Sequence, residues 1–290
     1  MRASTPVVHG LPGHGWTLKK LARCVQSRCG RSVGQTTLRR IVRAAGLRWK
    51  KCKKLLRKAR APQRAAYMAR FQALWARMCQ DDVTVVYVDE SHFHQDLDIG
   101  YTWATKGKPA WRVSNSPPLS ARINWYGAYD FTHGQALLWH EGKCNSEQTR
   151  QFLQRLHDWQ RELGQRELGQ RELGQRELGQ MGHAAHKRIV LIWDGAPWHR
   201  SLAVRRQAQH LGIELIPLPA YSPDLNPIEG LWKWMRTEVT QHHCHASLDV
   251  LSLDCQAFIQ QINQEPQAMI DRLWPRFELD PDYEKLLLST

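Results

Sequence analysis

Residues 190–199 read VLIWDGAPWH, and this stretch decides how the rest of the chain is interpreted. It begins with an apolar run that includes β-branched side chains, a pattern typical of a buried strand. Gly195 and Pro197 follow Asp194, so the strand is expected to end at that carboxylate. The end of a central strand is where open α/β sheets bind their ligands. Asp194 is therefore a candidate site residue.

Two further carboxylate positions lie on either side of this stretch. Residues 83–90 read VTVVYVDE and predict a second buried strand, which carries Asp89 and Glu90. Residues 221–229 read YSPDLNPIE and predict the start of a helix with Glu229 one turn in. Two strand carboxylates and one helix carboxylate are what a site needs to hold a pair of hard divalent cations against phosphate oxygens.

The residues alone leave the choice between Asp89 and Glu90 open. Adjacent strand residues point to opposite faces, so only one of the two can face Asp194. Chemically the two carboxylates are equivalent candidates. The other one would then support the site without binding the metal.

Two other polar residues near the predicted acids have alternative interpretations. Asp224 is a weaker rival of Glu229, because a Pro-Asp pair more simply begins a turn or caps the following helix. His199 follows Asp194 by five residues and could orient a water or a phosphate, or it could be a structural hydrogen-bonding residue. We therefore expect His199 to support the metal ligands without binding the metal. The same is expected of whichever acid of the Asp89 and Glu90 pair does not bind it.

Composition restricts the class of protein. The 290 residues are 42% hydrophobic, which is ordinary for a globular protein and enough for one large and one small domain. No apolar run reaches membrane-spanning length. The seven cysteines form no CxxC pair, which excludes a zinc ribbon and gives no sign of a disulfide framework. We expect a soluble protein of the cytoplasm that is not associated with a membrane.

Charge divides the chain into two parts. The formal net charge is +14, yet residues 1–80 hold 20 of the 41 lysines and arginines and no acidic residue. The remaining residues have a net charge of −6. This segregation indicates a basic module that binds a polyanion, attached to a body that is not basic.

The basic module has the periodicity of two short helices. Thr17 is expected to cap the first helix, and Gly30 to end it. Ser32 and Gln35 form a predicted capping box for the second. Its predicted buried stripe consists of Leu38, Ile41, Val42 and Ala45.

The opposite face of the second helix is basic. We expect it to enter the DNA major groove, as in a helix-turn-helix, through Thr36, Arg39, Arg40 and Arg43. A basic helical hairpin without this role is the alternative. The stretch after it could follow a phosphate backbone through Lys50, Lys51, Lys53 and Lys54.

The chain order predicts three regions: a helix-turn-helix module at 1–60, a linker helix at 61–80 and a catalytic domain at 81–290. In the last region, antiparallel strands at 83–89, 100–104, 109–113, 123–129 and 135–140 are followed by alternating helices and strands. The predicted fold class is α/β, a mixed sheet with helices on its faces, preceded by a small all-α, winged-helix-like module. A final helical stretch is expected at 247–274.

Two segments do not fit this plan. Residues 161–180 repeat Arg-Glu-Leu-Gly-Gln four times, and leucines five residues apart form no apolar helix face. We expect this low-complexity insertion to project from the body as a helix or loop. Residues 242–245 read HHCH, but their spacing is poor for a tetrahedral zinc site.

Four segments resemble the DDE transposases of bacterial insertion sequences related to the mariner elements. They are VDES at 88–91, GYTWATKG at 100–107, WDGAPWH at 193–199 and LPAYSPDLNPIE at 218–229. The resemblance extends from about residue 83 to 240. It implies a ribonuclease-H-like fold, a metal-dependent reaction that cuts and joins DNA, and Asp89, Asp194 and Glu229 as the catalytic acids. The 34 residues between the last two acids match the spacing that this superfamily favours.

The resemblance also implies a bacterial protein associated with the nucleoid, and it implies cofactors and partners. Two Mg²⁺ or Mn²⁺ ions would be held by the three acids. The partners would be the terminal inverted repeats of the element, target DNA with a TA preference, and a second copy of the chain when DNA is bound. Relatives carry two helix-turn-helix units and only one is legible here, so we expect an incomplete DNA-binding part. The alternatives are a catalytically silent DNA-binding protein derived from such an element and a structure-specific nuclease.

Overall fold

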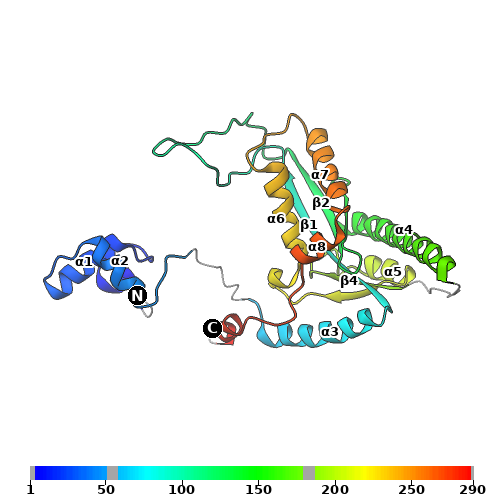
Figure 1. The fold of residues 1–290 in the computed structure, drawn as a ribbon, viewed down its shortest axis with the longest axis horizontal. Coiled ribbons are helices and arrows are strands. Elements are labelled where there is room, and N and C mark those ends of the chain that lie inside the picture. Colours follow the sequence, from blue (N-terminus) through cyan, green and yellow to red (C-terminus); the bar gives the residue numbers. More distant parts are fainter. Residues whose placement is uncertain (1–3, 51–57, 179–186, 289–290) are drawn as a thin grey trace. The chain divides into compact units, whose positions relative to one another are not determined.

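The computed structural model describes residues 4–50, 58–178 and 187–288. The chain divides into two compact units, residues 1–55 and 56–290. Each unit is described separately below (Figure 1). Within the described ranges, no helix is long and apolar enough to cross a membrane.

The first unit is helical. A short 3-10 helix, η1 (Pro6–His9), precedes α1 (Leu18–Cys29) and α2 (Gln35–Ala44). Thr17 caps α1 as predicted, because its hydroxyl accepts the Lys20 backbone N–H at 3.2 Å. Gly30 ends this helix with a φ of +63°, a conformation that favours glycine. The two helices and the turn between them agree with the predicted helix-turn-helix.

Two details of the prediction for α2 were wrong. The residue before the helix is Gly34, which has no side-chain cap, so Ser32 and Gln35 form no capping box. The predicted stripe is also incomplete: Leu38 is buried and Val42 half-buried, but Ile41 and Ala45 are exposed. A helix in a unit this small meets too few neighbours to cover four apolar positions.

The second unit is built on a five-stranded mixed sheet. The strands are β1 (Val83–His94), β2 (Arg122–Asp130), β3 (Gln135–Trp139), β4 (Arg188–Trp193) and β5 (Glu214–Pro217). Their order is β3-β2-β1-β4-β5. The first three strands pair antiparallel, while β4 runs parallel to β1 and β5. Because Tyr87 pairs with Ile192, Asp89 and Asp194 follow at the same level of the two neighbouring strands.

Helices cover both faces of this sheet. One face packs on α3 (Ala61–Cys79), α6 (Ile228–Met235), α7 (Leu248–Ile262) and α8 (Pro266–Arg272). The other packs on α4 (Ser146–Leu178) and α5 (Leu202–His210). The alternation of β1 assigns Val85 and Tyr87 to the first face and Val86 and Val88 to the second.

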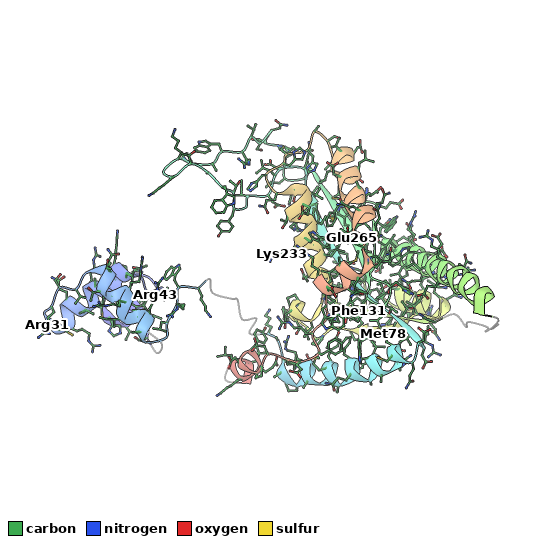
Figure 2. All side chains as sticks on the ribbon, in the orientation of Figure 1. Arg31, Arg43, Met78, Phe131, Lys233 and Glu265 are labelled. Carbon is green, nitrogen blue, oxygen red and sulfur yellow. The ribbon has the colours of Figure 1, made fainter. Side chains whose placement is uncertain are left out.

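Three shorter elements complete the second unit: 3-10 helix η2 (Pro223–Leu225), π-helical η3 (Arg236–Thr240) and α9 (Pro281–Leu288). The helix α3, expected as a linker, is part of this core. Its buried apolar side chains are Tyr67, Met68, Phe71 and Leu74. Figure 2 shows side chains filling the space between α3 and the sheet, where Met78 and Phe131 are labelled.

The strands predicted at 100–104 and 109–113 are absent. Residues 99–121 contain no strand and form a long loop between β1 and β2 (Figure 1). Its large apolar side chains are exposed: Ile99, Tyr101, Trp103, Trp111, Val113 and Leu119. Their β-type composition has no effect here because no neighbouring strand is within reach to pair with them.

The repeat at 161–180 was expected to be a helix or a loop, and its described residues are helical. It continues α4 to Leu178, and Figure 1 shows this helix extending past the sheet. The first repeat packs against the body, because Leu163 is buried. Glu167 lies 3.3 Å from His133 and 3.4 Å from Lys187. The insertion is therefore anchored at its start. The repeat pattern did not predict this, because its leucines form no apolar helix face.

Candidate active site

The acidic pair in the middle of β1 is divided between the two faces of the sheet. Asp89 lies on the α6 side, where its Oδ2 accepts the Trp232 indole N–H at 3.0 Å. Glu90 lies on the opposite side, where its Oε1 accepts the Trp198 indole N–H at 3.0 Å. The alternation predicted for adjacent strand residues is therefore present, and the two carboxylates have different neighbours.

A histidine joins Glu90 to Asp194. His199 Nε2 lies 2.8 Å from Glu90 Oε1, and its Nδ1 lies 2.9 Å from Asp194 Oδ1. The imidazole is 1% exposed and stacks on Trp193, with ring centroids 4.2 Å apart. His199 thus fixes the orientation of Asp194, and its place behind the metal ligands stays a prediction.

Asp194 directly follows the last residue of β4, and a turn that begins at Asp194 holds its side chain in place. Its Oδ1 also accepts the Ala196 backbone N–H at 2.9 Å, the turn that an aspartate before Gly and Pro favours. The side chain is 54% exposed. Both contacts use Oδ1, so Oδ2 is the oxygen that a cation or a phosphate-bound water would meet.

Close packing of α6 on β2 positions the Asp89 side chain. The indole of Trp232 lies directly against Gly127, the β2 residue paired with Asp89. A Cβ atom at Gly127 would overlap the ring atoms of Trp232. Only glycine allows α6 to approach this closely, and this approach brings the indole N–H to the carboxylate. The sequence favours Trp232 as a core residue but does not predict its contact with Gly127.

Glu229 lies in the first turn of α6, as predicted, and its side chain is exposed. A cavity of about 380 Å³ lies beside it, and its lining includes Ser91, Lys233 and Arg236. Arg236 donates to Ser91 Oγ and to the His92 carbonyl, both at 2.9 Å. Two cationic side chains, of which Lys233 is labelled in Figure 2, therefore lie one and two turns after Glu229 on the same side of the helix.

The acids repel one another electrostatically. Burial raises the pKa of Asp89 to about 8, and the charges of Glu229 and Glu90 add to the shift. Burial also raises the pKa of Glu229, an effect that Arg236 opposes and Asp194 reinforces. A divalent cation would favour the ionised form of these carboxylates and offset their repulsion, so the donor set fits Mg²⁺ or Mn²⁺.

The His199 bridge has the opposite electrostatic effect. Burial disfavours the imidazolium, but hydrogen bonds to Asp194 and Glu90 together raise the pKa of His199 to about 9. Burial likewise disfavours ionised Asp194, yet His199 and the Ala196 N–H lower its pKa. Asp194 is therefore kept ionised at neutral pH, ready to bind a cation.

Asp224 has a structural role. Its carboxylate forms a bidentate pair with Arg64 of α3, with two contacts of 2.9 Å. Arg64 is completely buried and also donates to Glu284 of α9 at 2.7 Å. Asp224 is held in an ion pair by α3, so the structure favours Glu229 as the helix acid.

The residues predicted to bind DNA lie in the first unit. Thr36, Arg39, Arg40 and Arg43 are exposed along α2, as is Lys50 beyond it. Figure 2 shows Arg43 on this helix. Lys51, Lys53 and Lys54 lie outside the described residues.

Comparison with known proteins agrees with this geometry. Residues 84–252 match a family model described as DDE superfamily endonuclease. None of the curated proteins compared with this chain matches it significantly.

Solved structures share the fold. The mariner Mos1 paired end complex with Mn is 19% identical, with a TM-score of 0.56 over 95% of this chain and 74% of that chain. The paired end complex with Mg is 19% identical, with a TM-score of 0.55 over 97% and 80%. The Mos1 strand transfer complex is 18% identical, with a TM-score of 0.51 over 93% and 82%.

Proposed function

The chain belongs to the DDE superfamily of endonucleases, and on this basis we propose that it is the transposase of a mobile DNA element. It would bind the terminal inverted repeats of that element, cut the DNA and join the ends to a target, with TA as the preferred target. The observation that supports the proposal is that acids from β1, β4 and α6 lie near enough to affect one another's pKa values. Asp89 and Asp194 lie at one level of neighbouring strands, and Glu229 is electrostatically coupled to both.

Asp89, Asp194 and Glu229 are the proposed ligands of two Mg²⁺ or Mn²⁺ ions. When bound, such ions activate an attacking oxygen and stabilise the leaving oxygen of a phosphodiester. The chain itself supplies positioning. Trp232 holds Asp89 from the α6 side, and His199 holds Asp194 from the opposite side.

Phosphate binding beside Glu229 is assigned to α6 and to the first residue of η3. Lys233 and Arg236 line the cavity next to this acid, and their positive charge would attract a DNA phosphate toward it. Arg236 is already fixed by Ser91 and the His92 carbonyl, so little side-chain freedom remains to be lost on binding.

Recognition of the DNA ends is assigned to the first unit. The basic face of α2 would enter the major groove, and the lysines that follow it would contact the backbone. The exposed aromatic side chains of residues 99–121 offer a surface that a second copy could cover in a DNA-bound homodimer.

A cleavage and joining assay tests this function. The substrate is an end-labelled duplex that carries the inverted repeat flanking the gene, with a plasmid as target. We expect a nick at the repeat boundary and joined products in Mg²⁺, and neither with a shuffled repeat. A protein that binds the repeat but never cuts it would be a silent repressor or decayed copy. Cutting without preference for the repeat would indicate a structure-specific nuclease.

A further inference from the structure

We propose that His243, His245 and Asp254 form a binding site for a late first-row divalent metal ion such as Zn²⁺. The two histidines belong to the connection between η3 and α7, and the aspartate lies on α7. The site shares no residue with the proposed catalytic acids.

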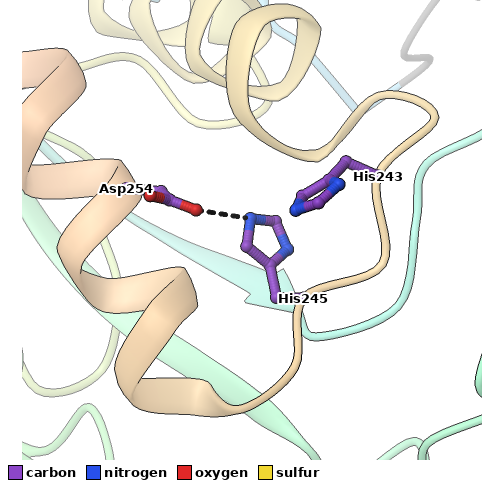
Figure 3. A group of neighbouring side chains, drawn as sticks. All are labelled: His243, His245 and Asp254. Carbon is purple, nitrogen blue, oxygen red and sulfur yellow. Dashed lines mark ion pairs between the residues drawn. The ribbon is translucent and has the colours of Figure 1, made fainter.

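The three side chains are arranged around a common point. One ligand atom from each lies within 4.8 Å of the others. The two imidazole rings are 4.6 Å apart at 79°, and His245 Nε2 lies 3.4 Å from Asp254 Oδ2. Figure 3 shows the side chains turned toward one another.

His245 gives the independent reason to expect a ligand. Its side chain is completely buried, yet neither ring nitrogen has a well-formed hydrogen bond. Its polar neighbours are the Asp254 carboxylate, at ion-pair distance, and the Gln95 backbone. Buried polar groups without partners are rare in folded proteins, and each requires an explanation. Coordination of an ion by one ring nitrogen would satisfy this group.

The donor atoms select the class of metal. Imidazole nitrogens suit Zn²⁺, Co²⁺ and Ni²⁺, whereas Mg²⁺ prefers oxygen ligands. Three protein ligands leave a fourth tetrahedral position for water. His243 and Asp254 are exposed, so an ion can reach the site from solvent.

The sequence alone did not reveal this site, because the third ligand comes from a helix. The spacing within 242–245 is too short for two pairs of zinc ligands. Cys244, between the two histidines, is outside the group. Asp254 completes it only because α7 folds back over the connection.

An ion at this site would also stabilise the segment that precedes the long loop at 99–121. The His245 backbone N–H donates to the Gln95 carbonyl at 3.0 Å, and Gln95 Nε2 donates to the His245 carbonyl at 3.1 Å. The His242 N–H donates to the Asp98 carbonyl at 2.9 Å. An ion that joins the connection to α7 would therefore also fix the segment from which the loop emerges.

Co²⁺ titration of the full chain tests the proposal. Excess Mg²⁺ is present to occupy the oxygen-only acids, and the visible absorption of tetrahedral Co²⁺ is followed. We expect one Co²⁺ per chain, displaced by Zn²⁺. His243→Ala and Asp254→Asn should each weaken binding by at least about tenfold, the loss that even an outer-shell partner causes.

Matched controls define the outcome. His210→Ala removes another exposed histidine, and Asp249→Asn makes the same change elsewhere on α7. Both should bind Co²⁺ like the parent, and Zn²⁺ should raise the Tm of both but not of the His243 or Asp254 variants. Parent-like Co²⁺ affinity in those two variants would overturn the proposal. A signal lost only in Asp194→Asn would instead assign the ion to the neighbouring Glu90, Asp194 and His199 group.

Discussion

Replacing Gly127 by Ala should damage the site through packing alone. Residue 127 has no catalytic atom, but an added Cβ would overlap the six-membered ring of Trp232. The indole must then shift, and its 3.0 Å hydrogen bond to Asp89 lengthens or breaks. Overpacking a core position costs about 1–3 kcal/mol. The displacement should also lower the cleavage rate by about a hundredfold, the loss expected when a reacting group moves by about 1 Å.

Two comparison variants separate the effect of packing from two others. One controls for the change from glycine to alanine itself, and the other removes only the hydrogen bond to Asp89. Gly164→Ala is the matched control, because its Cβ would meet no atom within 4 Å. It should stabilise α4 by up to about 1 kcal/mol and leave cleavage unchanged. Trp232→Phe retains a ring but removes the N–H donor to Asp89. We expect its cleavage rate to fall, with less loss of stability than Gly127→Ala.

Urea unfolding and a nicking assay in Mg²⁺ measure the two effects. DNA affinity should stay unchanged, because binding is assigned to the first unit. If Gly127→Ala is as stable and as active as Gly164→Ala, then the close approach of α6 does not position Asp89, and this reasoning is wrong.

Three other measurements examine separate parts of the molecule. Arg64→Ala should lower the free energy of unfolding by about 3–5 kcal/mol in urea, because it leaves Asp224 and Glu284 without their buried partner; an equally stable variant would contradict this. Burial disfavours the His133 imidazolium, but the hydrogen bond to Asp130 and the charges of Asp130 and Glu167 together raise its pKa above 6.5. The stabilisation is therefore present below pH 6.5 and is lost as pH rises through the folded pKa. The stability difference between parent and His133→Gln should be larger at pH 6 than at pH 9, and a difference that grows with pH would refute the assignment. Arg39→Ala and Arg43→Ala should each weaken end binding by about 1–3 kcal/mol at fixed salt, unlike Arg205→Ala on α5; equal effects of all three would exclude α2 as the reading helix.

Much of the sheet could be predicted from sequence because its signals are local. Residues 83–89 and 190–193 are apolar runs that end at acids, and each is a central strand of the sheet. The strands expected at 100–104 and 109–113 show where this reasoning fails. Strand formation depends on a partner, and the apolar side chains there have none to pair with.

The site was predictable as a set of acids but not as an arrangement. The positions of Asp194 and Glu229 followed from strand and helix boundaries. The His199 bridge to Glu90 could not be derived, because it joins residues 109 positions apart through the tertiary fold. The same holds for Trp232 and Gly127, whose contact arises only when α6 packs on β2. A glycine in the middle of a strand was the one available signal of a close approach.

The central claim is that Asp89, Asp194 and Glu229 hold the metal ions that cut DNA. The most direct measurement compares nicking rates of Asp89→Asn, Asp194→Asn and Glu229→Gln with Glu90→Gln in Mg²⁺, on a duplex that carries the inverted repeat. The first three variants should lose at least about a hundredfold in rate at unchanged DNA affinity, since neutral side chains of the same size cannot balance the ions. Glu90→Gln should retain more activity than Asp89→Asn, because Glu90 contacts His199 on the other face. Parent-like rates in the Asp194 and Glu229 variants, or a Glu90 variant slower than Asp89→Asn, would contradict the assignment.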